Sequence, residues 1–210
     1  MKVNIYDKFI AKENYGKTLK VLVMLKEYHE ETYYHSVDVA NRALEIAQKL
    51  NYTPQQLQTI YTACLVHDVG KMLVPVELLN KKGPLSKEER NFLQLTHIQS
   101  TYKILSGTFP DEICNIAYHH HEKLNGSGYP NGLTDEMLSV DDRIIAVADI
   151  TSALAMKRSY KEPLSADTCA SILSGMVQKG ELDGEITAIS ISNLYAKEKL
   201  QQLPDDEITM

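Results

Sequence analysis

Eight side chains of the kinds that bind metal ions are spread over five separate segments of the chain. They are, in chain order, Glu31, His35, His67, Asp68, His97, His120, His121 and Asp149. Imidazole and carboxylate groups together suit iron or manganese at least as well as zinc, since no thiolate is among them. Because the five segments all have helical periodicity, the pattern indicates a metal site in the interior of a helical bundle.

Each of these residues taken alone also has an ordinary structural interpretation. A lone His97 among apolar neighbours is more often a half-buried histidine than a ligand, and Glu31 lies in the charged stretch EYHEETYYH, where a solvated face is the default. Asp149 differs, because an unpaired carboxylate in the apolar run IIAVADITSAL needs a basic partner or a metal. His119, the first of three consecutive histidines, is interpreted as a surface or supporting residue.

The elements that must position these side chains are predicted to be helices. Apolar residues recur three and four positions apart, as at Val37, Ala40 and Leu44, and no long alternating stretch indicates a strand. We therefore predict an all-α fold, a single helical bundle of about seven to eight helices. The expected helices cover residues 17–50 in one or two pieces, 54–67, 86–105, 110 to the three histidines, 143–156, 165–179 and 185–201.

Short motifs mark several boundaries of these helices. Thr53 followed by Pro54 is typical of a helix start, and SKEE at 86–89 is a capping-box pattern. The stretch HDVGK, which begins at His67, interrupts the second helix. The segment Glu122 to Asp142 is rich in glycine and proline, so we expect it to be a loop.

Composition excludes several classes of protein. The chain has 210 residues, of which 43% are hydrophobic and 24% charged, as expected for one soluble globular domain. Its net charge of -6 argues against binding to DNA or RNA polymers or to anionic membranes. The longest apolar run, VLVML, is too short to span a membrane, and three scattered cysteines indicate a reducing compartment. We therefore expect a cytoplasmic protein.

The order of the motifs resembles the HD superfamily of metal-dependent phosphohydrolases, and within it the HD-GYP subfamily, which hydrolyses the second messenger cyclic di-GMP. The matching elements are His35, HDVGK at 67–71, LLNKKGPLSKEE at 78–89, His97, HHEKLNGSGYPNGL at 120–133, RIIAVAD at 143–149 and RSYK at 158–161. The HD pair alone is weak evidence, whereas seven elements in the right order are specific.

This resemblance implies a set of metal ligands. Positions matching His35, His67, Asp68, His97, His120, His121 and Asp149 hold two metal ions in the family. Asp68 bridges the ions, and Glu31 occupies the position of a glutamate that helps to hold a third metal in some members. The resemblance thus implies two or three divalent ions, hydrolysis by a hydroxide that bridges them, and Asp68 and Lys71 as catalytic residues.

The resemblance also implies substrate contacts. Lys71 would reach a phosphate as a point charge. Tyr129, in the glycine-hinged GYP loop, would stack on a guanine face, while Arg158 and Lys161 would neutralise phosphates. The ordinary alternatives are a turn residue packed on the surface for Tyr129 and a solvated helix end for the two basic residues.

Three positions depart from the family pattern. The family usually has glycine at the position of Thr101, aspartate at that of Asn125, and a second aspartate at that of Ser152. In addition, ELDG at 181–184 matches the expected FDP-like stretch only weakly. None of these changes removes a metal ligand. They bear on the shape of the loop and on substrate preference.

The expected domain organisation is an N-terminal helical extension over 1–30 and an HD-GYP catalytic domain over 31–210. The extension is too short for a signal-input domain, so we expect a short helix that caps the bundle or makes a homodimer contact, with regulation by a partner protein. The expected function is hydrolysis of cyclic di-GMP to pGpG, or on to GMP. One alternative is an HD hydrolase acting on another cyclic dinucleotide or a nucleotide phosphate. A nucleotide-binding signalling module with little activity is the other.

Overall fold

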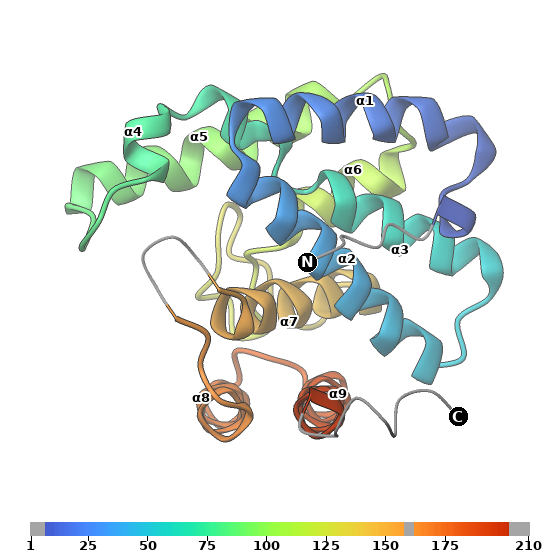
Figure 1. The fold of residues 1–210 in the computed structure, drawn as a ribbon, viewed down its shortest axis with the longest axis vertical. Coiled ribbons are helices and arrows are strands. Elements are labelled where there is room, and N and C mark those ends of the chain that lie inside the picture. Colours follow the sequence, from blue (N-terminus) through green and yellow to red (C-terminus); the bar gives the residue numbers. More distant parts are fainter. Residues whose placement is uncertain (1–6, 158–161, 202–210) are drawn as a thin grey trace.

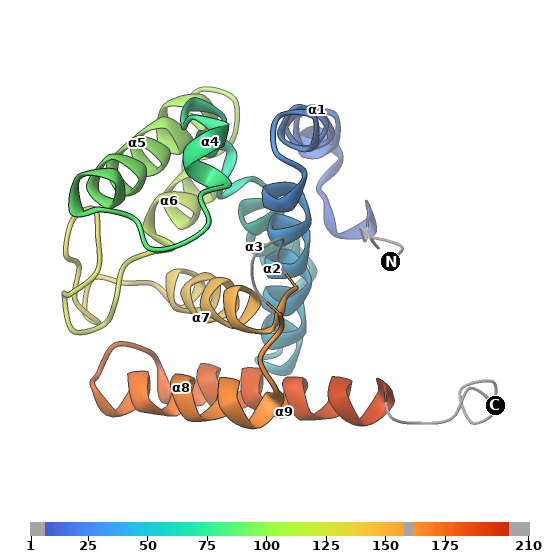
Figure 2. The ribbon, with the colours of Figure 1, turned by 60° about the vertical axis from the view of Figure 1, so that its left-hand side comes forward.

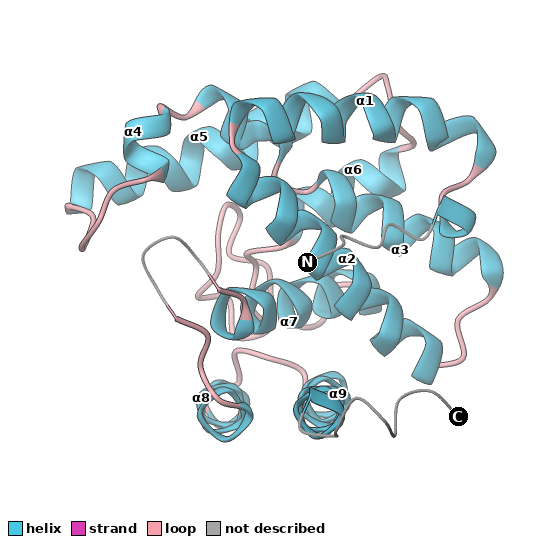
Figure 3. Ribbon diagram, viewed as in Figure 1, coloured by secondary structure: helices cyan, strands magenta, loops and turns pink. Residues whose placement is uncertain are grey.

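The computed structural model describes residues 7–157 and 162–201, and the regular elements of this part are all helical (Figures 1 and 3). The α-helices are α1 Lys12–Tyr28, α2 Glu30–Lys49, α3 Pro54–Val66, α4 Val76–Leu79, α5 Lys87–Leu105, α6 Asp111–His119, α7 Val140–Ala155, α8 Ala166–Gln178 and α9 Gly184–Gln201. Two short 3-10 helices are η1 at Asp7–Phe9 and η2 at Val69–Leu73. The predicted all-α fold is confirmed, and α4, with only 4 residues, is the helix that the periodicity did not predict.

Capping residues explain why two helices begin where the sequence predicts. The Thr53 side chain accepts a hydrogen bond from the backbone N–H of Gln56, whose side chain accepts one in return from the Thr53 N–H. Ser86 and Glu89 make the same reciprocal pair at the start of α5. Each pair satisfies backbone donors that no helical bond can reach.

Two predicted boundaries are wrong, and local geometry gives the reason. The first helical stretch begins at Lys12 rather than residue 17, and it is divided at His29, whose extended backbone ends α1 and whose ring caps α2. The loop predicted to reach Asp142 ends at Ser139, since these two residues form a third capping box. Helix α7 therefore begins at Val140 instead of Arg143.

The core lies where α2 packs along α3 and α7, and α1 lies across α2 and α3 (Figure 1). The apolar face predicted for α2 is buried at Val37, Ala40 and Leu44, and each large side chain of this kind contributes about 1.5–3 kcal/mol when fully buried. Helices α8 and α9 pair with each other beside α7, on the side opposite α1 (Figure 2). Among the described residues, no helix is both long and apolar enough to cross a lipid bilayer.

Candidate metal centre

The fold brings together seven of the eight side chains predicted as metal ligands. They form three groups whose potential ligand atoms lie within 4.8 Å of one another. The groups are His97, His120 and His121; His35, His67 and Asp149; and His67, Asp68 and His120. The groups share His67 and His120, so they form one continuous cluster supplied by α2, α5, α7 and the ends of α3 and α6.

Three of the histidines are oriented by the same contact. His67, His97 and His120 each place Nδ1 2.7 Å from a backbone carbonyl oxygen three or four residues earlier. A carbonyl only accepts, so Nδ1 carries the proton and Nε2 keeps its lone pair. Nε2 of all three is buried without a hydrogen-bond partner. This arrangement, in which the backbone holds the ring and Nε2 faces inward, is typical of metal-ligating histidines.

The two aspartates lie between these rings. Asp68 directs Oδ2 toward Nε2 of His67, at 3.4 Å, and Oδ1 toward Nε2 of His120, at 3.8 Å. Asp149 places Oδ1 2.8 Å from Nε2 of His35 and Oδ2 3.5 Å from Nδ1 of His121. Each carboxylate thus directs its two oxygens toward two different imidazole rings.

Burial keeps most of the imidazoles neutral, as ligation requires. It lowers the pKa of His97 to about 4 and that of His121 to about 3. The pKa values of His35 and His120 are also lowered, with burial again the largest cause. These four rings can therefore offer lone pairs at neutral pH.

The acidic members stay ionised. Burial works against the charged form of Asp68, but the charges of Lys71 and His67 outweigh it and hold its pKa well below the usual range. Burial also opposes ionisation of Asp149, whose pKa is nevertheless lowered by the hydrogen bond from His35 and by neighbouring imidazoles. His67 is the exception among the rings, since Asp68 raises its pKa despite burial.

The buried polar atoms of this cluster fit a divalent cation. Buried polar atoms without partners are costly, and they are rare in folded proteins. Four of them face this one cluster: Nε2 of His67, His97 and His120, and Oδ1 of Asp68. Each of the four can offer a lone pair once any proton has left, and water or another protein donor would satisfy them one at a time, whereas a metal ion satisfies several together.

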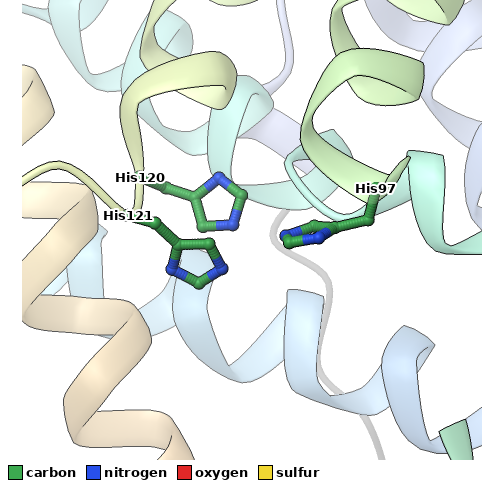
Figure 4. A group of neighbouring side chains, drawn as sticks. All are labelled: His97, His120 and His121. Carbon is green, nitrogen blue, oxygen red and sulfur yellow. The ribbon is translucent and has the colours of Figure 1, made fainter. Parts of the chain in front are cut away.

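The three consecutive histidines lie in different surroundings. His120 and His121 leave the end of α6 and point toward His97 on α5 (Figure 4), and the ring centroids of His120 and His121 are 4.0 Å apart. His119 turns away and places Nδ1 3.2 Å from Oδ1 of Asp142, a buried residue in the capping box of α7. His119 thus links the end of α6 to the start of α7, which agrees with a supporting residue.

Glu31 and Lys71 lie at one side of the cluster. Glu31 belongs to none of the three groups, but with His35 and Lys71 it lines an adjacent pocket of about 260 Å³. Other lining residues include His29, Leu78, Lys81 and Leu93. Lys71 Nζ donates to Oδ2 of Asp68 at 2.6 Å. The pocket therefore combines an acidic and a basic group next to the predicted metal ligands.

Tyr129 packs against the cluster. Its ring centroid lies 4.7 Å from that of His121 and 6.4 Å from that of His97, and burial raises the pKa of its phenol, so the group stays protonated. Its backbone N–H donates to the carbonyl oxygen of His121 at 3.2 Å. The ring therefore lies beside the predicted ligands His97 and His121, unlike a turn residue on the surface.

Glu122 is a residue that the sequence analysis missed. It is buried, with 2% exposure, and its carboxylate accepts hydrogen bonds from the backbone N–H groups of Asn131 at 2.7 Å and Leu133 at 3.0 Å. The glutamate thereby closes the GYP loop on itself, directly after His121. Its position between a predicted histidine ligand and a glycine-rich segment is the signal in the sequence that could have identified it.

Two departures from the family pattern make specific contacts. The Thr101 hydroxyl donates to the carbonyl oxygen of His67 and accepts from the N–H of Gly70, both at 3.0 Å, which ties α5 to the HD segment. The Asn125 amide donates to the carbonyl oxygen of Lys179 at 3.0 Å, a bond that an aspartate could not donate. Two other predicted residues, Arg158 and Lys161, lie outside the described residues.

Comparison with known proteins agrees with this architecture. A family model described as HD domain matches residues 18–186. The chain belongs to the HD domain family. The resemblance indicated by the ordered motifs is thereby confirmed.

Several curated relatives of this HD domain are named as phosphodiesterases. The 3'3'-cGAMP-specific phosphodiesterase 1 of Vibrio cholerae is 33% identical over 162 residues, which cover 77% of this chain and 38% of the relative. The cyclic di-GMP phosphodiesterase of Thermotoga maritima is 31% identical over 192 residues, which cover 87% of this chain and 52% of the relative. The chain thus spans about half, or less, of the length of these relatives.

Solved structures share the fold of this HD domain. The HD domain of the phosphodiesterase PgpH from L. monocytogenes, in complex with cyclic-di-AMP, has a TM-score of 0.66 at 21% identity, over 88% of this chain and 98% of that one. An HDGYP protein from Bdellovibrio bacteriovorus has a TM-score of 0.65 at 23% identity, over 77% and 52% of the two chains. At such identities the likeness establishes the fold alone.

Proposed function

We propose that this HD domain is a metal-dependent phosphodiesterase that hydrolyses cyclic di-GMP to the linear dinucleotide pGpG. The observation that carries the proposal is the buried cluster of five imidazoles and two carboxylates, four of whose atoms lack any hydrogen-bond partner. Relatives that are 31–36% identical are named as phosphodiesterases of cyclic dinucleotides, which supports the substrate class. The GYP loop beside the cluster favours cyclic di-GMP among them.

The cluster would hold two divalent ions, iron or manganese, with Asp68 between them and Glu31 at the side of a third. Such ions supply Lewis acidity that makes water nucleophilic at neutral pH and neutralises charge at the reacting phosphorus. The chain's own residues fix where this happens. Backbone carbonyls fix the orientation of the His67, His97 and His120 rings, and the low pKa values of His97 and His121 mean that protons do not compete with a metal for their lone pairs.

Lys71 is proposed as the phosphate contact. Its ammonium group lies at the boundary between Asp68 and the 260 Å³ pocket, so a phosphodiester bound there would receive a charge-assisted hydrogen bond. This bond strengthens as negative charge develops on the phosphate oxygens. Tyr129 would stack on a guanine, and Arg158 and Lys161, outside the described residues, are proposed to neutralise the second phosphate.

The test is turnover by the purified protein. Metal content is measured first, and cyclic di-GMP is then incubated with protein loaded with Fe²⁺ or Mn²⁺ under reducing conditions, with pGpG and GMP resolved by chromatography. We expect turnover that depends on the metal and is abolished in His67→Ala and Asp68→Ala. Tight binding of cyclic di-GMP without turnover in a metal-loaded sample would instead identify a nucleotide-binding signalling module.

A second candidate substrate is supported by the names of the relatives. Three of them are 3'3'-cGAMP-specific phosphodiesterases, at 33–35% identity. The same assay with 3'3'-cGAMP and cyclic di-GMP in competition compares the two values of kcat/KM. A higher kcat/KM for 3'3'-cGAMP would identify it, instead of cyclic di-GMP, as the preferred substrate. The proposed reaction, hydrolysis of a phosphodiester, would stay the same.

We infer a cytoplasmic location, and a division into a helical extension over residues 1–30 and a catalytic domain over residues 31–210. Helix α1 packs on α2 and α3, which supports a capping role for the extension. A homodimer or a regulatory protein partner remains our proposal for how activity is controlled. Light scattering of the purified protein tests the homodimer.

A further inference from the structure

The GYP loop, which lies between α6 and α7, contacts the turn that joins α8 to α9 (Figure 2). The backbone N–H of Leu124 donates to the carbonyl oxygen of Glu181 at 3.1 Å. Nζ of Lys123 donates to Oε2 of Glu181 at 2.6 Å. The side-chain amide of Asn125 donates to the carbonyl oxygen of Lys179 at 3.0 Å. Three consecutive residues of the loop are thus bonded to one short segment from a distant part of the chain.

The α8–α9 turn has a defined shape, because α8 ends in a Schellman motif. Gly180 has a φ of 67°, in the left-handed region that favours glycine. Its N–H donates to the carbonyl oxygen of Val177, and the N–H of Glu181 donates to that of Met176, both at 2.9 Å. These bonds satisfy carbonyl groups in the last turn of α8. The next carbonyl groups, of Lys179 and Glu181, accept from the GYP loop instead.

The anchored residues also form the base of the loop that carries Tyr129. The carbonyl oxygen of Leu124 accepts a hydrogen bond from the N–H of Asp135 at 2.9 Å, which closes the loop. Tyr129 lies between these two ends, and its N–H donates to the carbonyl oxygen of His121 at 3.2 Å. A shift at the base of the loop therefore moves the ring that packs on His121.

The far end of the loop is connected to the same pair of helices. Nη2 of Arg143 donates to the carbonyl oxygen of Asp135 at 2.6 Å. Nη1 of the same guanidinium lies 3.3 Å from Oδ2 of Asp183, the residue before α9. Both ends of the loop are thus linked to the segment that joins α8 and α9.

We propose that Lys123, Asn125 and Glu181 are positioning residues, which anchor the GYP loop on the α8–α9 turn and thereby place Tyr129 for a nucleobase. The effect on the substrate rests on the proposed function, whereas the anchoring of the loop does not. The proposal also gives a role to Asn125, a position where the family usually has aspartate. Its amide supplies the N–H that the carbonyl oxygen of Lys179 accepts, and a carboxylate has no such donor.

Two substitutions weaken the anchor at one contact each. Asn125→Asp keeps the shape of the side chain and an acceptor for the N–H of Ser127, which lies 3.1 Å away, but it loses the donor to Lys179. Glu181→Gln keeps the size of the side chain and removes the negative charge that pairs with Lys123. Neither residue belongs to the cluster of predicted metal ligands.

A control and a rescue complete the set. The matched control is Glu45→Gln, which removes the charge that pairs with Lys197 of α9 at 2.8 Å, an ion pair that joins the same helix to α2 and includes no residue of the loop. In the rescue, Glu181→Lys places two ammonium groups together, and Lys123→Glu added to it restores an ion pair with the charges exchanged.

The loop is followed by hydrogen exchange with mass spectrometry, and the substrate by steady-state kinetics of Mn²⁺-loaded protein with cyclic di-GMP. In Asn125→Asp and Glu181→Gln we expect faster exchange over residues 122–138, because an anchored loop opens less often. KM should rise about 2–10-fold, as loss of one hydrogen bond of ordinary strength gives. Metal content and kcat should stay natural, because the loop contacts a base and not the reacting phosphate.

The control variants make the result specific to the anchor. Glu45→Gln should show natural exchange of the loop and a natural KM, and the charge-exchanged double variant should recover both from the losses of Glu181→Lys. Equal changes in Glu45→Gln and Glu181→Gln would reflect general loosening of α9 and refute the anchor, as would natural exchange of the loop in Asn125→Asp and Glu181→Gln.

The outcomes separate this inference from the proposed function. Faster exchange of the loop with a natural KM would refute the placement of Tyr129 by the anchor, while the phosphodiesterase stands. If the natural protein binds cyclic di-GMP without turnover, the proposed function fails, and the dissociation constant from calorimetric titration replaces KM in the same comparison. If it does not bind a cyclic dinucleotide at all, the proposed function and the placement of Tyr129 fall together, and hydrogen exchange still supports or refutes the anchor.

Discussion

At the scale of single residues, the structure assigns different tasks to neighbouring histidines. Nε2 of His120 is buried without a partner and faces the cluster, whereas His119 is hydrogen-bonded to Asp142 outside it. We expect His120→Ala to lose metal binding by more than the roughly 100-fold that loss of a supporting hydrogen bond costs. His119→Ala should keep its metal and lose about 1 kcal/mol of stability, as is usual for one hydrogen bond.

Metal content after dialysis and thermal unfolding of both variants check this prediction. The two substitutions remove the same atoms from adjacent positions, so each serves as the control for the other. Equal loss of metal in both variants would show that the division of the histidines is wrong.

Residue chemistry also explains which members of the site could be predicted. Imidazoles and carboxylates show their ligand chemistry in their residue type, and the order of the family motifs then selects His97 and Asp149 among them. Glu122 acts through partners that the sequence does not display, since they are backbone N–H groups nine and eleven residues further along the chain. Such supporting roles require the folded chain.

At the scale of elements, the GYP loop is held against the end of α6 by a close approach at Gly128. A Cβ atom placed there would lie 2.5 Å from Cα of Glu122 and 2.6 Å from the carbonyl oxygen of His121. Both are backbone atoms, which cannot rotate away as the end of a side chain could. Gly128→Ala must therefore displace the loop and the adjacent Tyr129. We expect KM for the cyclic dinucleotide to rise by about tenfold or more, since a shifted stacking group costs 1–3 kcal/mol.

Gly175→Ala is the matched control for this prediction. Gly175 lies within α8, where an added Cβ meets nothing within 4 Å, and alanine should stabilise the helix by up to about 1 kcal/mol. Steady-state kinetics and metal content are compared for both variants. A normal KM in folded Gly128→Ala protein would remove Tyr129 and its loop from the substrate site.

Helix starts could be predicted only where the sequence contains a complete capping-box pattern. Thr53 and Ser86 each precede a glutamine or glutamate three positions later, so both starts were found. Ser139 instead has an aspartate, Asp142, three positions later. The shorter aspartate side chain makes the same reciprocal hydrogen bonds, but it is a weaker signature of a helix start in the sequence. The predicted loop therefore extends too far. The division at His29 had no glycine or proline to mark it.

At the scale of the whole molecule, the candidate metal centre lies where several helices of the bundle meet. The seven clustered side chains come from α2, α5 and α7 and from the ends of α3 and α6, so the helices cannot separate without dispersing the site. The same unpartnered atoms that make the site fit for a cation make the folded state less stable without one, because each is a buried polar group that water would satisfy in the unfolded chain.

Metal removal should therefore destabilise the entire fold. A ligand that binds only the native state stabilises it by about 2.7 kcal/mol at a free concentration 100 times its dissociation constant, and each kcal/mol shifts the unfolding midpoint by about 2–4 °C in a protein of this size. We expect Mn²⁺ to raise the midpoint of chelator-treated protein by about 5–11 °C, as measured by calorimetry. In His67→Ala, which lacks the residue shared by two of the three groups, the increase should disappear. An unchanged midpoint in the natural protein would mean that the cluster satisfies its buried atoms without a metal.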